Sequence, residues 1–319
     1  MTPEPVKSLK GRDLLSLAEF SHAEIKYILD LAAELKQRQK IGRGVWPYAP
    51  TALAGKTLGM IFQKASTRTR VSFEVAMYQL GGYALYLNAN DLQLGRGEAI
   101  ADTARVLSRY LDGLVIRTYA QEDVEELALH ANVPVINGLS DLYHPCQVLA
   151  DLQTIREYKG SLEDLKLAYV GDGNNVCHSL LIVAAKLGLL LFIATPEEYS
   201  PAEKVIALAR QIARQTESKI EILNSPVETV ANADVIITDV WTSMGQEASS
   251  KQRRKAFAPY QVNSALVKHA RPDFIFLHCL PAHRGEEVTS DIIDGPHAVV
   301  WDEAENRLHV QKAILSLVM

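Results

Sequence analysis

The stretch Ser66-Thr67-Arg68-Thr69-Arg70 decides how the rest of this chain is interpreted. It follows an apolar run at residues 57–62 that is typical of a strand, and it leads into residues 71–80, which predict a helix. The free N–H groups and the positive dipole end at such a helix start favour an anion. Hydroxyl groups can donate to a phosphate, and Arg68 can hold two of its oxygens at once. Three hydroxyls interleaved with two arginines therefore predict a phosphate site, in preference to a plain helix cap beside solvated arginines.

The composition predicts a globular protein with two domains. The 319 residues exceed one typical core, and 48% hydrophobic with 22% charged residues is typical of soluble proteins. A net charge of −5 gives no sign of a nucleic-acid surface, so we expect no nucleic-acid partner. We interpret the short basic run at residues 251–255 as a solvated loop or helix face.

Three features favour a cytoplasmic protein without a membrane span. The N-terminal residues are polar and lack the apolar core of a signal peptide. The longest apolar stretch, residues 179–195, is interrupted by a lysine and a glycine, which favours a buried helix followed by a buried strand. Cys146, Cys177 and Cys279 match neither a disulfide framework nor a zinc site, and we therefore expect a reducing location and no bound metal.

Strand-like and helix-like segments alternate along the chain, which predicts parallel sheets covered by helices. We expect an α/β fold with two doubly wound domains in series, residues 1–150 and 151–319, joined near a helix at residues 144–158. A closing helix at residues 304–317 carries Arg307 near its start and is expected to pack back on the first domain. Ligands of such sheets bind at the carboxyl ends of the strands, so we expect the active site in the cleft between the domains.

Chemically distinctive side chains lie at these strand ends. They are Arg117, Asn175, Asp239 and Cys279. His144 and Gln147 flank a proline at a second helix start that favours an anion. The polar segment at residues 240–258 is long for a connection inside a compact domain and predicts a lid.

Gly171-Asp172-Gly173 resembles the start of a dinucleotide-binding turn. The third glycine of that pattern would fall at Val176, and no acid closes the next strand as the pattern requires. A nicotinamide dehydrogenase is therefore the alternative from another enzyme class, and nicotinamide binding would test it. This alternative gives the Ser66 to Arg70 stretch no function.

Four signatures resemble the aspartate/ornithine carbamoyltransferase family over nearly the whole chain. They are FQKASTRTR at residues 62–70, HPCQ at 144–147, DVWTSMG at 239–245 and HCLP at 278–281. The first two are shared by carbamoyltransferases generally, and the last two mark the ornithine branch. The resemblance implies transfer of the carbamoyl group of carbamoyl phosphate to the δ-amine of L-ornithine, which gives L-citrulline and phosphate in arginine metabolism. No cofactor is implied.

The resemblance also implies which residues bind each substrate. Carbamoyl phosphate would be bound by Ser66, Thr67, Arg68, Thr69, Gln93, Arg117, His144, Pro145, Cys146, Gln147, Cys279, Leu280 and Arg307. L-Ornithine would be bound by Asn175, Asp239, Ser243 and Met244. Gln93 is expected to reach the site of a neighbouring subunit, because the family forms homotrimers with shared active sites.

The chemistry of the transfer assigns roles to five of these residues. The δ-amine of ornithine should resemble that of lysine, with a pKa of about 10.4, so it must lose a proton before it attacks. Asp239 and Cys279 are predicted to orient this amine and to assist proton removal. Arg117 and His144, together with Thr69, are predicted to stabilise the tetrahedral oxyanion.

The sequence leaves other possibilities open. A carbamoyltransferase that uses another amine, such as putrescine or an acylated ornithine, would keep the same phosphate site. A binding or regulatory protein that has lost activity would keep the same fold. The residues also do not distinguish biosynthesis from arginine breakdown, because both directions use the same groups.

Overall fold

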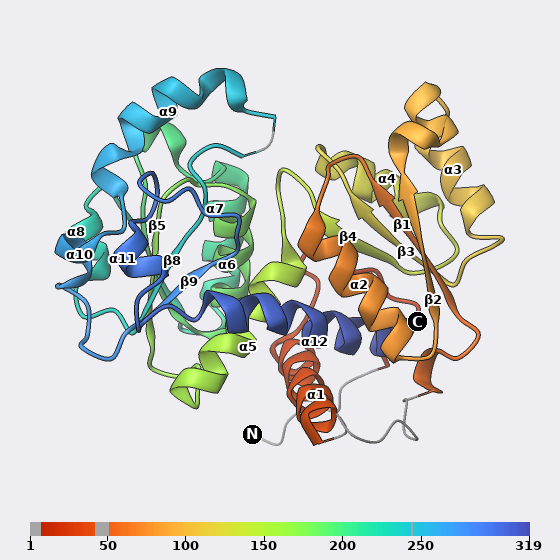
Figure 1. Ribbon diagram of the computed structural model, residues 1–319, viewed down its shortest axis with the longest axis horizontal. Coiled ribbons are helices and arrows are strands. Elements are labelled where there is room, and N and C mark those ends of the chain that lie inside the picture. The colour runs from red at the N-terminus through yellow and green to blue at the C-terminus, as the bar shows by residue number, and fades with distance from the viewer. Residues whose placement is uncertain (1–7, 42–50, 244) are drawn as a thin grey trace. The chain divides into compact units, whose positions relative to one another are not determined.

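The computed structural model describes residues 8–41, 51–243 and 245–319 (Figure 1). Two compact units make up the chain: Met1–Gln153 with Glu305–Met319, and Thr154–Ala304. Each unit contains one parallel sheet, which confirms the predicted fold class. Among the described residues, no helix combines the length and the apolar character that crossing a membrane requires.

The sheet of the first unit has four strands in the order β2-β1-β3-β4. Its elements are α1 (His22–Ile41), β1 (Thr57–Phe62), α2 (Thr67–Gln79), β2 (Tyr83–Asn88), α3 (Ile100–Leu107), β3 (Gly113–Arg117), α4 (Gln121–His130), β4 (Val135–Leu139) and most of α5 (Pro145–Lys159) and α12 (Val300–Val318). The central strands β1 and β3 are buried almost throughout, as expected of strands covered on both faces.

The direction in which the chain crosses this sheet decides which face each helix covers. The step from β1 to β2 runs one way, and the later step from β3 to β4 runs the other way. Because parallel crossovers are right-handed, α2 covers one face and α3 and α4 cover the opposite face. α3 and α4 accordingly pack against each other, and Figure 1 shows α2 on the other side of the sheet. The reversal lies between β1 and β3, whose carboxyl ends therefore form the expected ligand-binding edge.

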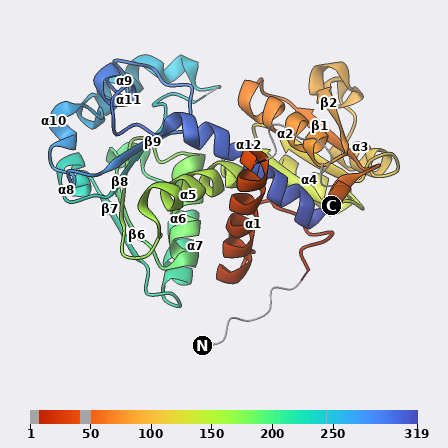
Figure 2. The ribbon, with the colours of Figure 1, turned by 60° about the horizontal axis from the view of Figure 1, so that its bottom comes forward.

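The sheet of the second unit has five strands in the order β7-β6-β5-β8-β9. Its elements are β5 (Lys166–Val170), α6 (Asn175–Leu187), β6 (Leu190–Ala194), α7 (Glu203–Ala213), β7 (Lys219–Leu223), α8 (Pro226–Val230), β8 (Val235–Thr238), α9 (Ser250–Phe257), α10 (Ser264–Val267), β9 (Ile275–His278) and α11 (Ser290–Ile293). α6 and α7 lie side by side on one face (Figure 1 and Figure 2). The chain reverses between β5 and β8, so the carboxyl ends of these two strands form the corresponding edge here.

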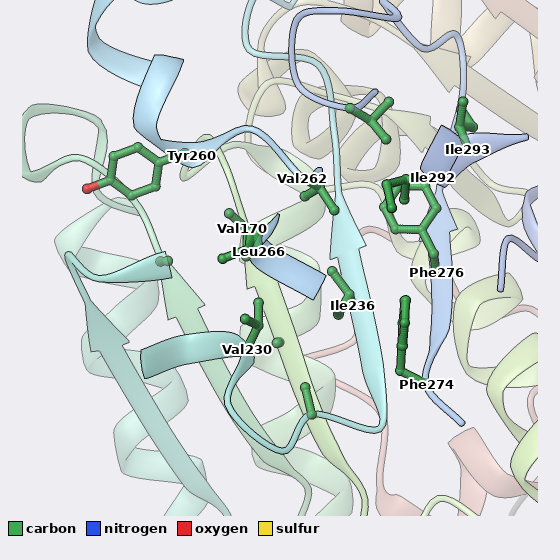
Figure 3. Packing of buried hydrophobic residues seen from close by; sticks show 14 of the residues in the cluster. Val170, Val230, Ile236, Tyr260, Val262, Leu266, Phe274, Phe276, Ile292 and Ile293 are labelled. Atoms are coloured by element: carbon green, nitrogen blue, oxygen red, sulfur yellow. The ribbon is translucent and has the colours of Figure 1, made fainter. Parts of the chain in front are cut away.

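A hydrophobic core fixes β8 and β9 from the face opposite α6 and α7. Figure 3 shows Ile236 of β8 and Phe276 of β9 in this cluster, packed with Val262 and Ile293 from the segments that follow. All four side chains are fully buried. Because the strands are held along their length, the residues just after them are held as well.

The helix α12 begins earlier than predicted. Its first turn carries Asp302 and Glu303, and acidic residues there interact favourably with the helix dipole, so the helix extends back to Val300. The expectation that Arg307 lies near the start of the helix was therefore wrong. Arg307 lies about two turns inside α12, as expected from 3.6 residues per turn.

Candidate active site

The turn after β1 begins the candidate site of the first unit. Ser66 is the N-cap of α2, and its Oγ accepts a hydrogen bond from the backbone N of Thr69 at 3.2 Å. The plain capping role is therefore present at Ser66. Thr67 is exposed, Arg68 is half-buried, and Thr69 is buried.

Two guanidinium groups converge on the side chain of Thr69. Arg307 donates from Nη2 to Oγ1 of Thr69 at 3.0 Å, and Nη1 of Arg117 lies 3.4 Å from the same oxygen. Arg307 also donates to Oε1 of Gln147 at 2.5 Å, and Gln147 donates to Asp151 at 2.8 Å. Arg117, which ends β3, and Arg307 from α12 thus place two positive charges at the switch point of this sheet. Such a concentration of cations suits a phosphate.

His144 lies in the same group and is buried. Burial, reinforced by the charges of Arg307, Arg117 and Arg68, lowers the pKa of His144 well below its ordinary value of 6.5. The imidazole is therefore neutral near pH 7 and can offer a hydrogen bond without adding to the positive charge.

Other predicted residues of this unit lie in different surroundings. Pro145 is the first residue of α5, and the thiol of Cys146 is directed at the carbonyl oxygen of Asn137, 3.7 Å away. Burial raises the pKa of Cys146 to about 11, so this thiol is protonated. Gln93 is exposed in a short 3₁₀ turn.

The candidate site of the second unit surrounds Asp239, which follows β8 and is buried. Oδ1 of Asp239 accepts hydrogen bonds from Sγ of Cys279 at 2.9 Å and from the backbone N of Val240 at 2.8 Å. Its Oδ2 accepts from Nδ2 of Asn174 at 2.7 Å. A carboxylate that is held by three donors at a strand end is well placed to orient an amine.

Asn174 is the site residue that the sequence reasoning missed. Its Oδ1 caps α6 by accepting from the backbone N of Val176 and Cys177, while its Nδ2 donates to Asp239. The neighbouring Asn175, which was singled out instead, is the first residue of α6. The signal that identifies Asn174 is its position immediately before an apolar helix, where asparagine is a preferred cap.

The segment after β8 is only partly described, since the predicted ligand Met244 lies outside the described residues. The carbonyl oxygen of Ser243 accepts a hydrogen bond from the backbone N of Gln246 at 3.0 Å. Ser243 also donates its own backbone N–H to Oε1 of Gln246 at 3.2 Å.

The basic run at residues 251–255 is not a simple solvated face. It lies on α9, and Arg253 within it is buried, with an ion pair to Asp172. Arg253 also donates to the carbonyl oxygen of Trp241 and lies over the ring of Tyr199, 4.5 Å from its centroid. One buried arginine therefore connects α9 with the turns after β5 and β8.

The Gly171-Asp172-Gly173 turn has a structural explanation. A Cβ atom at Gly173 would lie 2.3 Å from the backbone N of Pro201, so the chain itself occupies the space beside this glycine. Close backbone packing thus accounts for Gly173 without a dinucleotide.

Comparisons with known proteins match both halves of the chain. The carbamoyl-P binding domain of the aspartate/ornithine carbamoyltransferases matches residues 12–157, and the Asp/Orn binding domain of the same family matches residues 163–318. An ornithine carbamoyltransferase from Pyrococcus abyssi is 63% identical over 98% of both chains. The relative from Pyrococcus furiosus named "Ornithine carbamoyltransferase, anabolic" is 62% identical over 98% of both chains. A solved structure of the P. furiosus ornithine carbamoyltransferase has a TM-score of 0.94, with 98% of this chain and 99% of that chain covered.

Proposed function

Because this chain belongs to the aspartate/ornithine carbamoyltransferase family, we propose which of its residues carry out the reaction of the ornithine branch. That reaction is the transfer of the carbamoyl group of carbamoyl phosphate to the δ-amine of L-ornithine, which gives L-citrulline and phosphate. Each matched domain corresponds to one of the two substrates, so the residues divide by unit.

Carbamoyl phosphate is assigned to the first unit, Met1–Gln153 with Glu305–Met319. The observation that carries this assignment is the convergence of Arg117 and Arg307 on Thr69 beside the neutral His144. The cations and the start of α2 would hold the phosphate, and the neutral imidazole would donate to the carbonyl oxygen as it gains charge. The proposed ligands are Ser66, Thr67, Arg68, Thr69, Arg117, His144, Pro145, Cys146, Gln147 and Arg307, with Gln93 from a neighbouring subunit.

Ornithine is assigned to the second unit, Thr154–Ala304. Asp239 carries a negative charge at the switch point of the sheet, which suits a substrate with two amines better than it suits a dicarboxylate. The proposed ligands are Asn175, Asp239, Ser243 and Met244, to which the geometry adds Asn174. The carbonyl oxygens of Cys279 and Leu280 are proposed to accept from the carbamoyl NH₂ group.

The transfer itself requires an uncharged amine, a polarised carbonyl and a stabilised leaving group. Asp239, in contact with the thiol of Cys279, would orient the δ-amine and assist the loss of its proton. Arg117 and His144 would stabilise the oxyanion of the tetrahedral intermediate, and Arg68 with the α2 start would stabilise the departing phosphate.

We propose that the enzyme works in arginine biosynthesis in the cytoplasm. A relative that is 62% identical is named anabolic, and this supports the biosynthetic direction. The three cysteines are free thiols, and this supports a reducing compartment.

We also propose a homotrimer with shared active sites, as the family resemblance implies. Four large apolar side chains are exposed on α2 and the edge strand β2 of the first unit: Val71, Tyr78, Tyr83 and Leu85. Large apolar side chains that are exposed on two neighbouring elements are a feature of subunit interfaces, and this supports the proposal. Analytical ultracentrifugation tests the assembly, and a monomer at micromolar concentration would contradict it.

The experiment that tests the proposed function is an assay of carbamoyl transfer with ornithine, aspartate, putrescine and N-acetylornithine in parallel. Turnover with ornithine alone is the expected result. Turnover with another amine would keep the phosphate site of the first unit and overturn the assignment of Asp239 and Ser243. The absence of turnover with every amine would overturn both assignments.

A further inference from the structure

His278, the last residue of β9, is fully buried and makes hydrogen bonds through both ring nitrogens. Nδ1 lies 2.9 Å from the backbone N of Leu280, and Nε2 lies 3.0 Å from Oε1 of Glu287. A backbone N–H group can only donate, so Nδ1 is the acceptor and carries no proton. The ring proton therefore lies on Nε2, which donates to the carboxylate of Glu287.

Two buried carboxylates hold this histidine. Glu287 is fully buried, and its Oε1 also accepts from the backbone N of His283 at 2.6 Å. Glu303, likewise buried, accepts from the backbone N of His278 at 2.8 Å. Burying a carboxylate is costly, and apolar side chains of similar volume would fill the same space without that cost. The arrangement therefore points to a role in positioning rather than in packing.

The contact from His278 to Leu280 fixes the direction of a carbonyl group. Leu280 has a φ of +56°, in the left-handed region that leucine rarely adopts. The peptide between Cys279 and Leu280 is planar and trans, so its N–H and C=O groups point in opposite directions. Because the Leu280 N–H points at Nδ1 of His278, the carbonyl of Cys279 points away from the imidazole.

The same peptide positions a reactive side chain. Sγ of Cys279 donates to Asp239 at 2.9 Å, so the carbonyl and the thiol of one residue are both set by the conformation that His278 holds. We propose that His278, kept in its Nε2-protonated form by Glu287, is a positioning residue for carbamoyl transfer through Cys279. This inference rests on the proposed roles of Cys279 and Asp239.

Asparagine and glutamine at position 278 separate the two contacts of the imidazole. The side-chain amide of asparagine takes the place of Nδ1 and can accept a hydrogen bond from the backbone N of Leu280. The side-chain amide of glutamine reaches the place of Nε2 instead and keeps only the contact with Glu287. We expect His278→Asn to retain kcat within about tenfold of the parent, and His278→Gln to lose on the order of 100-fold, as for a small misplacement of reacting groups. The matched control is His297→Gln in the same unit, whose Nδ1 contacts the Phe274 carbonyl oxygen at 2.9 Å and which should keep parental kcat.

Substitutions of Glu287 test the tautomer without touching the histidine. Glu287→Gln can still present an oxygen to Nε2–H, whereas Glu287→Leu removes the acceptor and favours a proton on Nδ1, where it would face the Leu280 N–H. We expect Glu287→Leu to lower kcat at least about tenfold more than Glu287→Gln. Equal losses in the two variants would overturn the tautomer argument, and the Glu287→Gln variant remains informative if a variant at position 278 does not fold.

The alkylation rate of Cys279 by iodoacetamide, followed by mass spectrometry without substrates, reports the position of the thiol independently of turnover. We expect His278→Gln to change this rate several-fold, while His278→Asn and His297→Gln keep the parental rate. The proposal is overturned if the asparagine and glutamine variants behave alike in kcat and alkylation, or if kcat per folded molecule stays parental in His278→Gln. If the parent makes no citrulline, the proposed function fails, whereas the alkylation ranking still decides the positioning role.

Discussion

Sγ of Cys279 lies 2.9 Å from Oδ1 of Asp239, although the two residues are 40 positions apart in the sequence. They follow the adjacent strands β9 and β8, whose register pairs His278 with Thr238. Because parallel strands in register end at the same level, the next residue of each strand meets the other at the sheet edge. This contact brings residues of the HCLP and DVWTSMG signatures together at one site.

The first prediction concerns the charge of Asp239. Asp239→Asn keeps the shape of the side chain but can neither attract a cationic amine nor take its proton. We expect kcat/KM for ornithine to fall at least about 100-fold, in the range found for loss of a catalytic hydrogen-bonding group. Citrulline formation at varied ornithine measures this change. The Kd of carbamoyl phosphate, measured by calorimetry, should stay within about threefold of the parent.

The control for Asp239 is Asp294→Asn, which removes an exposed carboxylate of the same unit that pairs with Arg284 at 2.7 Å. Exposed ion pairs contribute little, so this variant should keep parental kinetics. Retention of more than about a tenth of kcat/KM in Asp239→Asn would contradict the proposed role.

The second prediction concerns Arg307. Its guanidinium donates to both Thr69 and Gln147, a fork that lysine and methionine cannot reproduce. We expect Arg307→Met to raise the Kd of carbamoyl phosphate on the order of 100-fold, as for loss of a charge-assisted hydrogen bond in a buried site. Arg38→Met in the same unit is the control, because Arg38 is exposed on α1 and pairs with Glu34. Equal Kd values for the two variants would refute the assignment.

The two parallel sheets could be predicted from the sequence because apolar strand runs alternate with amphipathic helices. The strand ends followed from the same pattern, so Arg117, Asp239 and Cys279 were correctly located at sheet edges. These positions depend on local sequence and on the common direction of parallel strands. The local sequence and the strand direction can both be used without knowledge of how side chains pack.

The residues that could not be predicted are those whose role depends on contacts between distant segments. Arg253 looked like one of several solvated cations, and its burial depends on Asp172, which is far away in the sequence. Asn174 and Asn175 are the same residue type, and the start of α6 decides which of them caps the helix; the cap, Asn174, also donates to Asp239. Periodicity carries no information about such pairings.

The third prediction follows from the lowered pKa of His144. Burial and three arginines keep the folded protein from protonating this residue, whereas the unfolded chain takes up a proton below pH 6.5. The pKa is lower in the folded state, so the contribution of His144 to stability is lost as pH falls below 6.5, by up to about 1.4 kcal/mol per pH unit. The glutamine in His144→Gln cannot take up a proton, so this variant does not lose stability in this way as pH falls. As pH falls from 7.5 to 5.5, we expect the difference in urea denaturation midpoint between His144→Gln and the parent to shrink. A difference that stays constant over this range would contradict the role of His144.

The fourth prediction concerns the buried ion pair between Asp172 and Arg253. Burial raises the pKa of Asp172 to about 6, although the charge of Arg253 opposes the rise. A carboxyl group whose pKa is raised in the folded state makes the protein less stable as pH rises from the unfolded-state pKa to the folded-state pKa. In the parent protein this loss of stability therefore ends near pH 6. Arg253→Met removes the opposing charge and raises the pKa of Asp172 further. We therefore expect the variant to keep losing stability between pH 6 and 8, by up to about 1.4 kcal/mol per pH unit.

The double variant Asp172→Asn with Arg253→Met separates this pH effect from lost packing. Methionine at position 253 forfeits the contacts of Arg253 with Tyr199 and Trp241 in both variants, so that loss is common to them. Asparagine cannot ionise, so the double variant should show no fall in urea midpoint between pH 6 and 8. It should also be more stable than Arg253→Met at pH 8, because no unpaired carboxylate is left buried. If both variants lose stability equally over this range, the slope belongs to another group and Asp172 is not the titrating residue.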